Sequence, residues 1–142
     1  MQVSEVMTPG VKFINPEQTL DEAARIMAEF DIGALPVAEK NRLVGMVTDR
    51  DIVIRGLAGG KGPKAKVREV MSTKVMFCYE DEKVDHVAHN MGDIQVRRLP
   101  VVSREKQLVG IVSLGDVATR RGPDVAGDAI KSVSERRDSE AA

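Results

Sequence analysis

The sequence predicts a mixed α/β (α+β) fold: two tandem, pseudo-symmetric strand-helix-strand-strand-helix repeats followed by a C-terminal helix. The first observation is an internal repeat, because EVMT at residues 5–8 returns as EVMS at residues 69–72, and the tripeptide LPV recurs at the same spacing. The second is hydrophobic periodicity, which alternates between the patterns of helices and strands in each copy. The third is length. In a chain of 142 residues neither copy alone can bury a sizeable core, so we expect the two copies to pack through their sheets.

The first copy, residues 1–62, begins with a strand around Ile14 and continues with an amphipathic helix. TLDE at residues 19–22 has the spacing of a capping box, the pattern that starts many helices. The apolar residues that follow recur at helical spacing and form one stripe: Leu20, Ala23, Ala24, Met27 and Phe30.

A hairpin and a second helix complete this copy. Two short apolar runs, residues 34–38 and 43–47, flank a charged turn and therefore indicate a buried hairpin. The second helix includes Asp51, and the glycine-containing loop at residues 56–63 ends it and separates the two copies.

The second copy, residues 63–122, repeats this order, since LVGIVS at residues 108–113 matches LVGMVT of the first copy. Residues 123–142 form a C-terminal extension. Apolar residues fall at helical spacing from Val125 to Val133 and predict an extra helix. The polar residues 135–140 show no periodicity, so we expect a disordered tail there.

Composition excludes several classes of protein. The formal net charge is -1, which disfavours generic nucleic-acid binding and attraction to anionic lipid. The single cysteine cannot form an intrachain disulfide, and residues 1–5 lack the features of a signal peptide, so a reducing cytoplasm is expected. No apolar run approaches the roughly 18 residues of a membrane span, so no membrane partner is expected.

The most informative motif is repeated at the end of each hairpin: GMVTDRD at residues 45–51 and GIVSLGD at residues 110–116. Thr48 and Ser113 stand where helix N-caps belong, with Asp51 and Asp116 three residues later. A purely structural capping role explains this pattern. A strand-to-helix turn also places backbone N–H groups and a carboxylate together, and such a carboxylate can accept hydrogen bonds from a ribose diol.

Other patterns bear on phosphate binding and catalysis. Arg97 and Arg98 precede a predicted strand, and one of them must face the side where a phosphate could bind, whereas the first copy has Gly33 and Ala34 there. Neither a P-loop nor a nucleophile elbow is present. His86 and His89 align with polar surface residues, so no metal site is predicted, and Cys78 aligns with the predicted strand at Ile14, which favours a buried thiol over a nucleophile. We therefore expect no catalytic residues and no enzyme activity.

The Met-Thr/Ser pair, the Leu-Pro-Val strand and the Gly-x-x-Thr/Ser-x-x-Asp turn, each present twice, resemble paired cystathionine β-synthase (CBS) domains. The resemblance covers nearly the whole chain and is strongest to small stand-alone bacterial proteins made of one CBS pair. It implies two clefts between the repeats that bind AMP, ADP, ATP or NAD as ligands, with no catalytic cofactor. It also implies a disc-shaped homodimer.

The family's site residues transfer by position onto two sets. One cleft is expected to use Thr8, Ile32, Gly33, Arg98, Ile111, Ser113 and Asp116. The other is expected to use Met46, Thr48, Asp51, Ser72, Val96 and Arg97, with Ala34 standing where its twin has Arg98.

These observations predict a regulatory module that senses an adenine nucleotide and reports to an unknown downstream protein. The alternatives are a structural or interaction module with vacant clefts and, with less support, an enzyme that cleaves a nucleotide. The helices at residues 51–54 and 116–118 are apolar enough to predict a homodimer; the alternative is that the helix at residues 123–133 folds back over this surface.

Overall fold

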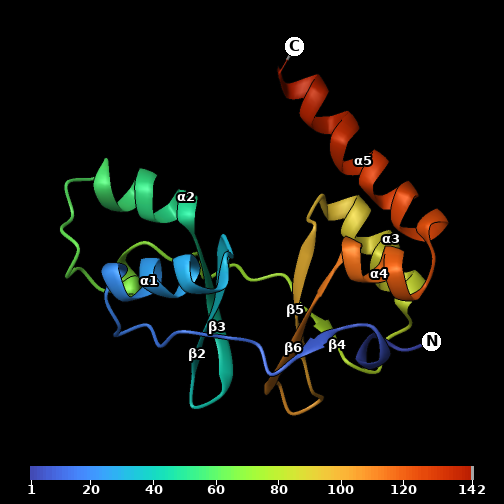
Figure 1. Cartoon of the computed structure of the whole chain (residues 1–142), viewed down its shortest axis with the longest axis horizontal. Helices are drawn as coiled ribbons and strands as arrows, with labels where there is room; N and C mark the ends of the chain where they lie inside the picture. The colour runs from blue at the N-terminus through green and yellow to red at the C-terminus, as the bar shows by residue number, and fades with distance from the viewer. Residues whose placement is uncertain (142) are drawn as a thin grey trace. The chain divides into compact units, whose positions relative to one another are not determined.

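The computed structural model describes the backbone of residues 1–141 and the side chains of residues 1–134. The chain divides into two compact units, which do not follow the repeat boundaries. The first-repeat unit is Lys12–Val75, and the second-repeat unit combines Met1–Val11 with Met76–Ala142. The N-terminal segment, shown in blue in Figure 1, therefore packs with the repeat that is more distant in sequence.

The first-repeat unit contains the antiparallel hairpin of β2 (Ala34–Glu39) and β3 (Arg42–Thr48) together with α1 (Leu20–Phe30). After β3 the chain forms α2 (Asp49–Asp51) and continues without a break as the π-helical segment η2 (Ile52–Leu57). The 3₁₀ turn η3 (Val67–Glu69) follows the loop that separates the repeats. The predicted first strand is reduced to one bridge between Ile14 and Val37, because Pro16 follows closely and lacks the N–H that a longer strand would need.

Helix α1 differs from its prediction in two details. The buried stripe is narrower than expected, since Ala24 is exposed and Phe30 is 43% exposed. The predicted capping box does not form, because the Thr19 hydroxyl donates to the Asp21 carboxylate instead of accepting a backbone N–H. The first N–H groups of α1 are satisfied by tertiary contacts, with the carbonyls of Ala65 and Pro63 2.9 and 3.0 Å away. The core of this unit is aliphatic: Ile14, Leu20, Ala23, Met27, Leu35, Val37, Val47, Val67 and Val70.

The second-repeat unit is built on a four-stranded sheet in the order β1-β6-β5-β4. Its strands are β1 (Thr8–Pro9), β4 (Cys78–Tyr79), β5 (Arg98–Val102) and β6 (Leu108–Ser113), and only the β4–β5 pair is parallel. Helix α3 (Val84–Ile94) lies between β4 and β5 in sequence, and α4 (Leu114–Arg120) follows β6. The predicted strand-helix-strand-strand-helix order is confirmed in this repeat.

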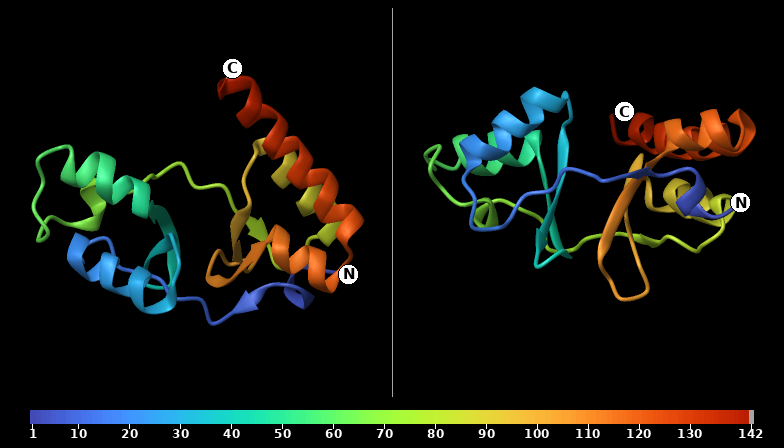
Figure 2. Two further views of the ribbon diagram at one scale, coloured as in Figure 1. Left: turned by 45° about the horizontal axis from the view of Figure 1, so that its top comes forward. Right: turned by 60° about the horizontal axis from the view of Figure 1, so that its bottom comes forward.

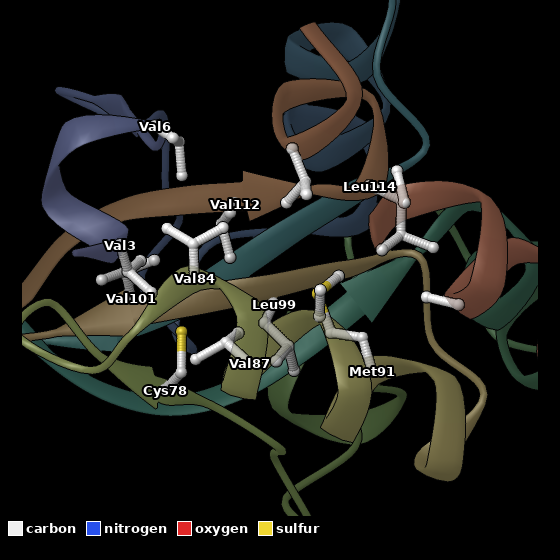
Figure 3. Close-up of a cluster of buried hydrophobic side chains, with 14 residues drawn as sticks. Val3, Val6, Cys78, Val84, Val87, Met91, Leu99, Val101, Val112 and Leu114 are labelled. Carbon is white, nitrogen blue, oxygen red and sulfur yellow. The ribbon is translucent and has the colours of Figure 1, made fainter. Parts of the chain in front are cut away.

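The core of this unit fills the space between the sheet and its helices. Figure 3 shows Val101, Leu99 and Val112 from the sheet meeting Val84, Val87 and Met91 from α3, with Val3 and Val6 contributed by the N-terminal segment. Leu99 and Val101 of β5 and Val112 of β6 point into this core. Because successive strand residues point to opposite faces, Arg98, Ile111 and Ser113 occupy the other face of the sheet.

Helix α5 (Pro123–Ala141) packs against α3 and α4 of the same unit, as Figure 2 shows. Its residues Ala126, Ala129 and Val133 are buried, and the absent side chain of Gly92 lets the Ala129 backbone approach within 3.2 Å of where a Cβ would stand. The helix includes residues 135–140, which we expected to be disordered. No glycine or proline interrupts the chain after Gly127, and its alanine, arginine and glutamate residues favour helix.

Within the described residues, no helix combines the length and apolar character that crossing a membrane requires.

Candidate functional site

Each hairpin ends in a strand-to-helix turn that holds a carboxylate in place. The Ser113 Oγ accepts the Asp116 N–H at 3.0 Å, and Asp116 Oδ2 accepts the Ser113 N–H at 3.1 Å. Thr48 and Asp51 form the same reciprocal pair, with both distances at 3.0 Å. The two predicted caps are therefore confirmed. Each cap orients its carboxylate through one oxygen only, which leaves the second oxygen for another partner.

The second carboxylate oxygen of the site aspartate has different neighbours in the two repeats. Asp51 Oδ1 lies 4.0 Å from Nε of Arg55, one helical turn further on. Asp116 Oδ1 has no hydrogen-bond or ion-pair partner among the side chains that the structure describes. Asp116 as a whole residue is half-buried rather than buried.

Sheet register gathers the predicted residues of the second-repeat unit on one face. Arg98 lies opposite Ser113 across β5 and β6, and Thr8 lies opposite Ile111 across β1 and β6. Paired residues point to the same side of a sheet, and this side is the one opposite the core. We call the set formed by Thr8, Arg98, Ile111, Ser113 and Asp116 the second-repeat face.

The first-repeat unit builds the same arrangement from corresponding positions. Ala34 lies opposite Thr48 in the hairpin, and Met46 forms a bridge with Ser72. We call the set formed by Ala34, Met46, Thr48, Asp51 and Ser72 the first-repeat face. The two faces match position by position, except that Ala34 replaces Arg98.

Two glycines explain how each Met-Thr/Ser segment reaches its face. A Cβ on Gly110 would lie 2.7 Å from both the Thr8 carbonyl oxygen and the Met7 sulfur. A Cβ on Gly45 would lie 2.9 Å from the Ser72 carbonyl oxygen and the Met71 sulfur. Real Cβ contacts do not occur at these distances, so both positions require glycine. Both glycines recur in the sequence together with the Met-Thr/Ser pair, and this repetition was the signal from which their packing role could have been predicted.

The remaining predicted residues belong to the other unit in each case. Ile32 and Gly33, expected with the Asp116 set, lie in the first-repeat unit, where the Gly33 carbonyl accepts the Asp49 N–H at 2.9 Å. Val96 and Arg97, expected with the Asp51 set, lie in the second-repeat unit, where the Arg97 carbonyl accepts the Leu114 N–H at 3.0 Å. The structure thus assembles five of the seven residues of one set and four of the six of the other within single units.

Sequence reasoning also missed a pair of arginines next to the faces. Arg55 and Arg120 each stand four residues after the site aspartate, a repeat visible in the sequence. The Arg55 guanidinium donates to the Val70 carbonyl at 3.4 Å, and the Arg120 guanidinium donates to the Met7 carbonyl at 3.5 Å. Each arginine therefore ties its helix to the segment that carries Ser72 or Thr8.

The other candidates for a reactive or metal-binding group are Cys78, His86 and His89. Burial, followed by the nearby Glu82 charge, raises the pKa of the Cys78 thiol to about 12, so it stays protonated, as expected of a structural thiol. The His86 ring lies 3.2 Å from the Asn90 amide, and His89 lies 3.2 Å from Asp93. In the part of the chain that the structure describes, no three His, Cys, Asp or Glu side chains are grouped as a metal site.

Comparison with known proteins identifies the family. The family model described as "CBS domain" matches residues 3–57 and again residues 67–121. The chain belongs to the CBS-domain family and contains a CBS pair. It is 40% identical over 133 residues to the CBS domain-containing protein YhcV of Bacillus subtilis, covering 93% of this chain and 94% of YhcV.

Two solved structures of CBS-pair proteins carry adenosine ligands. The CBS domain pair of protein MJ0100, in complex with 5′-methylthioadenosine and S-adenosyl-L-methionine, is 30% identical with a TM-score of 0.74, covering 87% of this chain and 98% of that one. CBSX2 in complex with AMP is 26% identical with a TM-score of 0.73, covering 84% of this chain and 95% of that one. These similarities confirm the predicted CBS-pair fold with its two repeats and C-terminal helix.

Proposed function

We propose that this CBS pair is a regulatory module that binds an adenine nucleotide, AMP, ADP, ATP or NAD, on its second-repeat face. The observation that carries the proposal is the Asp116 carboxylate, which the helix cap holds by one oxygen while the other oxygen has no partner among the described residues. The AMP complex of CBSX2 and the adenosine ligands of the MJ0100 pair support the ligand class.

Three side chains of the face have a chemical task in this proposal. Asp116 Oδ1 accepts hydrogen bonds from the ribose hydroxyls, because an ionised carboxylate forms strong bonds of this kind. The half-buried Ile111 offers an apolar surface for the adenine ring. The exposed Arg98 supplies a positive charge for the phosphate, and its guanidinium matches the geometry of phosphate oxygens.

The module regulates rather than catalyses in this proposal. Its faces offer carboxylates, hydroxyls and cations for binding, and we assign none of them as a nucleophile with its own base. Ligand binding favours one arrangement of the chain over others and so transmits a signal to a downstream protein in a reducing cytoplasm.

A homodimer is part of the same proposal. In the first-repeat unit Val53, Ile54 and Leu57 of η2 are 52%, 50% and 74% exposed, beside a groove of about 420 Å³ lined by Leu20, Ala24 and Pro63 among others. In the second-repeat unit α5 covers the corresponding helices. A second copy of the chain would bury the uncovered ridge and groove by two-fold symmetry.

Calorimetry and thermal unfolding with AMP and NAD test the proposed ligand. Both should raise the melting temperature of the protein, and Asp116→Ala should lower AMP affinity by about 1.5–3 kcal/mol, the range for hydrogen bonds to charged groups. Asp51→Ala is the matched control, because it removes an equivalent cap without touching the second-repeat face. NADP should bind more weakly than NAD, since the carboxylate repels a 2′-phosphate.

The outcomes separate the competing functions. AMP affinity unchanged by Asp116→Ala would remove this carboxylate from the site. A protein that none of the nucleotides stabilises would instead be a structural module, and a product formed from ATP, AMP or NAD would identify an enzyme.

A further inference from the structure

Helix α5 covers one side of the second-repeat unit, and the first-repeat unit has no counterpart of this helix. In the second-repeat unit α5 packs against α3 and α4 (Figure 2). Its residues Ala126 and Ala129 belong to the same buried cluster as Ala88 of α3 and Val117 of α4. Because the two repeats have corresponding helices, the first repeat shows the same kind of surface without a helix on it.

The corresponding surface of the first-repeat unit is apolar and open. Ala24 of α1 aligns with Ala88, which is fully buried, yet Ala24 is exposed. Val53 of η2 aligns with the partly buried Ala118 of α4, yet Val53 is 52% exposed. Both Ala24 and Val53 line the groove of about 420 Å³ between α1 and η2. An apolar groove of this kind is typical of a docking surface.

Small residues on α1 give this groove the shape that a helix needs. Helix α5 approaches α3 closely because Gly92 has no side chain, and a Cβ there would lie 3.2 Å from the Ala129 Cα. The first repeat has the exposed Ala28 at the corresponding position, one turn after Ala24. Residues four positions apart lie on the same face of a helix, so these two alanines let a second helix pack closely on α1.

One end of the groove carries an unbalanced positive charge. Asp21, which lines the groove, accepts hydrogen bonds from Lys64 at 2.9 Å and from Arg25 at 3.4 Å. The side chains of Lys64 and Arg25 are both largely exposed. The Asp21 carboxylate balances only one of their two charges, so this end of the groove favours an acidic partner.

The second repeat shows how a docked helix supplies that acidic group. Asp85 aligns with Asp21, and Arg121 donates hydrogen bonds to it at 2.7 and 2.8 Å. The bond to Asp85, and more weakly the charge of Asp124 in the first turn of α5, raise the pKa of Arg121. A helix docked in the same way on the first repeat would bring its first turn to Lys64.

We propose that the groove between α1 and η2 binds an amphipathic helix of another protein, with small apolar residues on its buried face and acidic residues in its first turn. Helix α5 shows this pattern within the chain, with Asp124 in its first turn and Ala126, Ala129 and Val133 buried. The proposal does not depend on nucleotide binding. A second copy of the chain, as in the proposed homodimer, would cover the same groove, so partner helix and second copy exclude each other.

A synthetic peptide of residues 123–134 tests the groove, because it carries the face of α5 that packs on the second repeat. The peptide is crosslinked through positions 127 and 131, which are exposed in α5, and circular dichroism verifies that it is helical. Fluorescence anisotropy should show that the labelled peptide binds wild-type protein. Light scattering should show the dimer mass falling towards that of one chain with its peptide.

Variants of the protein and of the peptide locate the binding. Ala24→Glu should weaken binding about tenfold, because it places a charge in the apolar groove. Met76→Glu, at an exposed apolar position in the other unit, is the matched control and should leave binding unchanged. Lys64→Glu should weaken binding about threefold, the size expected of an exposed charge pair, and a peptide with Asp124→Lys should bind this variant better than it binds wild type.

Two results would overturn the inference. The first is a helical peptide that does not bind, in which case light scattering shows whether a second copy fills the groove. The second is binding that Ala24→Glu leaves unchanged, because the peptide would then bind elsewhere on the chain. Nucleotide binding on the second-repeat face is measured separately, so a failure of the proposed function is distinguishable from a failure of this inference.

Discussion

Gly110→Ala should destabilise the second-repeat unit, because the added methyl group has no room. Its Cβ would lie 2.7 Å from the Thr8 carbonyl oxygen, a backbone atom that can move only if β1 moves. Moving β1 breaks its pairing with β6, where Thr8 is opposite Ile111 and Pro9 is opposite Gly110. Forcing extra methyl groups into a packed site costs about 1–3 kcal/mol. The upper part of this range applies because the obstacle is backbone rather than a flexible side chain.

The chain contains a matched control for this substitution. A Cβ on Gly127 in α5 would meet no atom within 4 Å. Alanine favours helix over glycine by about 1 kcal/mol, so Gly127→Ala should leave stability unchanged or raise it. Gly45→Ala should act like Gly110→Ala but in the first-repeat unit, since its Cβ would lie 2.9 Å from the Ser72 carbonyl oxygen.

Urea unfolding followed by circular dichroism measures these differences, with the transition of each unit fitted separately where two are seen. Gly110→Ala should also weaken AMP binding, because it displaces Thr8 from the second-repeat face. A Gly110→Ala protein as stable as wild type, with Gly127→Ala behaving as expected, would refute the close-approach argument. Equal losses in all three variants would show that glycine replacement in general, rather than the contact with Thr8, is responsible.

Two further predictions concern assembly and pH. Light scattering of the wild-type protein should give twice the chain mass of 15.5 kDa. Leu57→Glu should reduce the measured mass towards that of one chain, whereas Met76→Glu, at an exposed apolar position in the other unit, should not. A wild-type mass of one chain would reject the homodimer. Hydrogen bonds from Arg121, at 2.7 and 2.8 Å, hold the pKa of the Asp85 carboxyl below its usual value of about 4. The pair therefore stabilises the fold at pH values above about 4, and this stabilisation is lost as the pH falls through the lowered pKa. Arg121→Ala should therefore lower the melting temperature at pH 7 and flatten its fall in acid, and identical pH profiles for variant and wild type would contradict this role.

Local signals in the sequence were sufficient to predict much of the fold and the capping residues of each face. The caps at Thr48 and Ser113 depend on contacts only three residues apart, so a short motif predicts them. The hairpins follow from adjacent apolar runs, and the duplication predicts the same order of elements twice. The pairing of Arg98 with Ser113 then follows from the register of one hairpin.

Contacts between distant parts of the chain were decided by the tertiary structure. Thr8 joins its face through pairing with Ile111, more than a hundred residues away, and nothing in the local pattern of either segment specifies this partner. The carbonyls of Ala65 and Pro63 satisfy the start of α1, and so the capping box that the sequence predicted at Thr19 is not needed. The sequence by itself determined the elements whose hydrogen bonds join residues a few positions apart. The tertiary structure decided which groups pair when the two residues are far apart in the sequence, because such a pair forms only when the long loop between them closes.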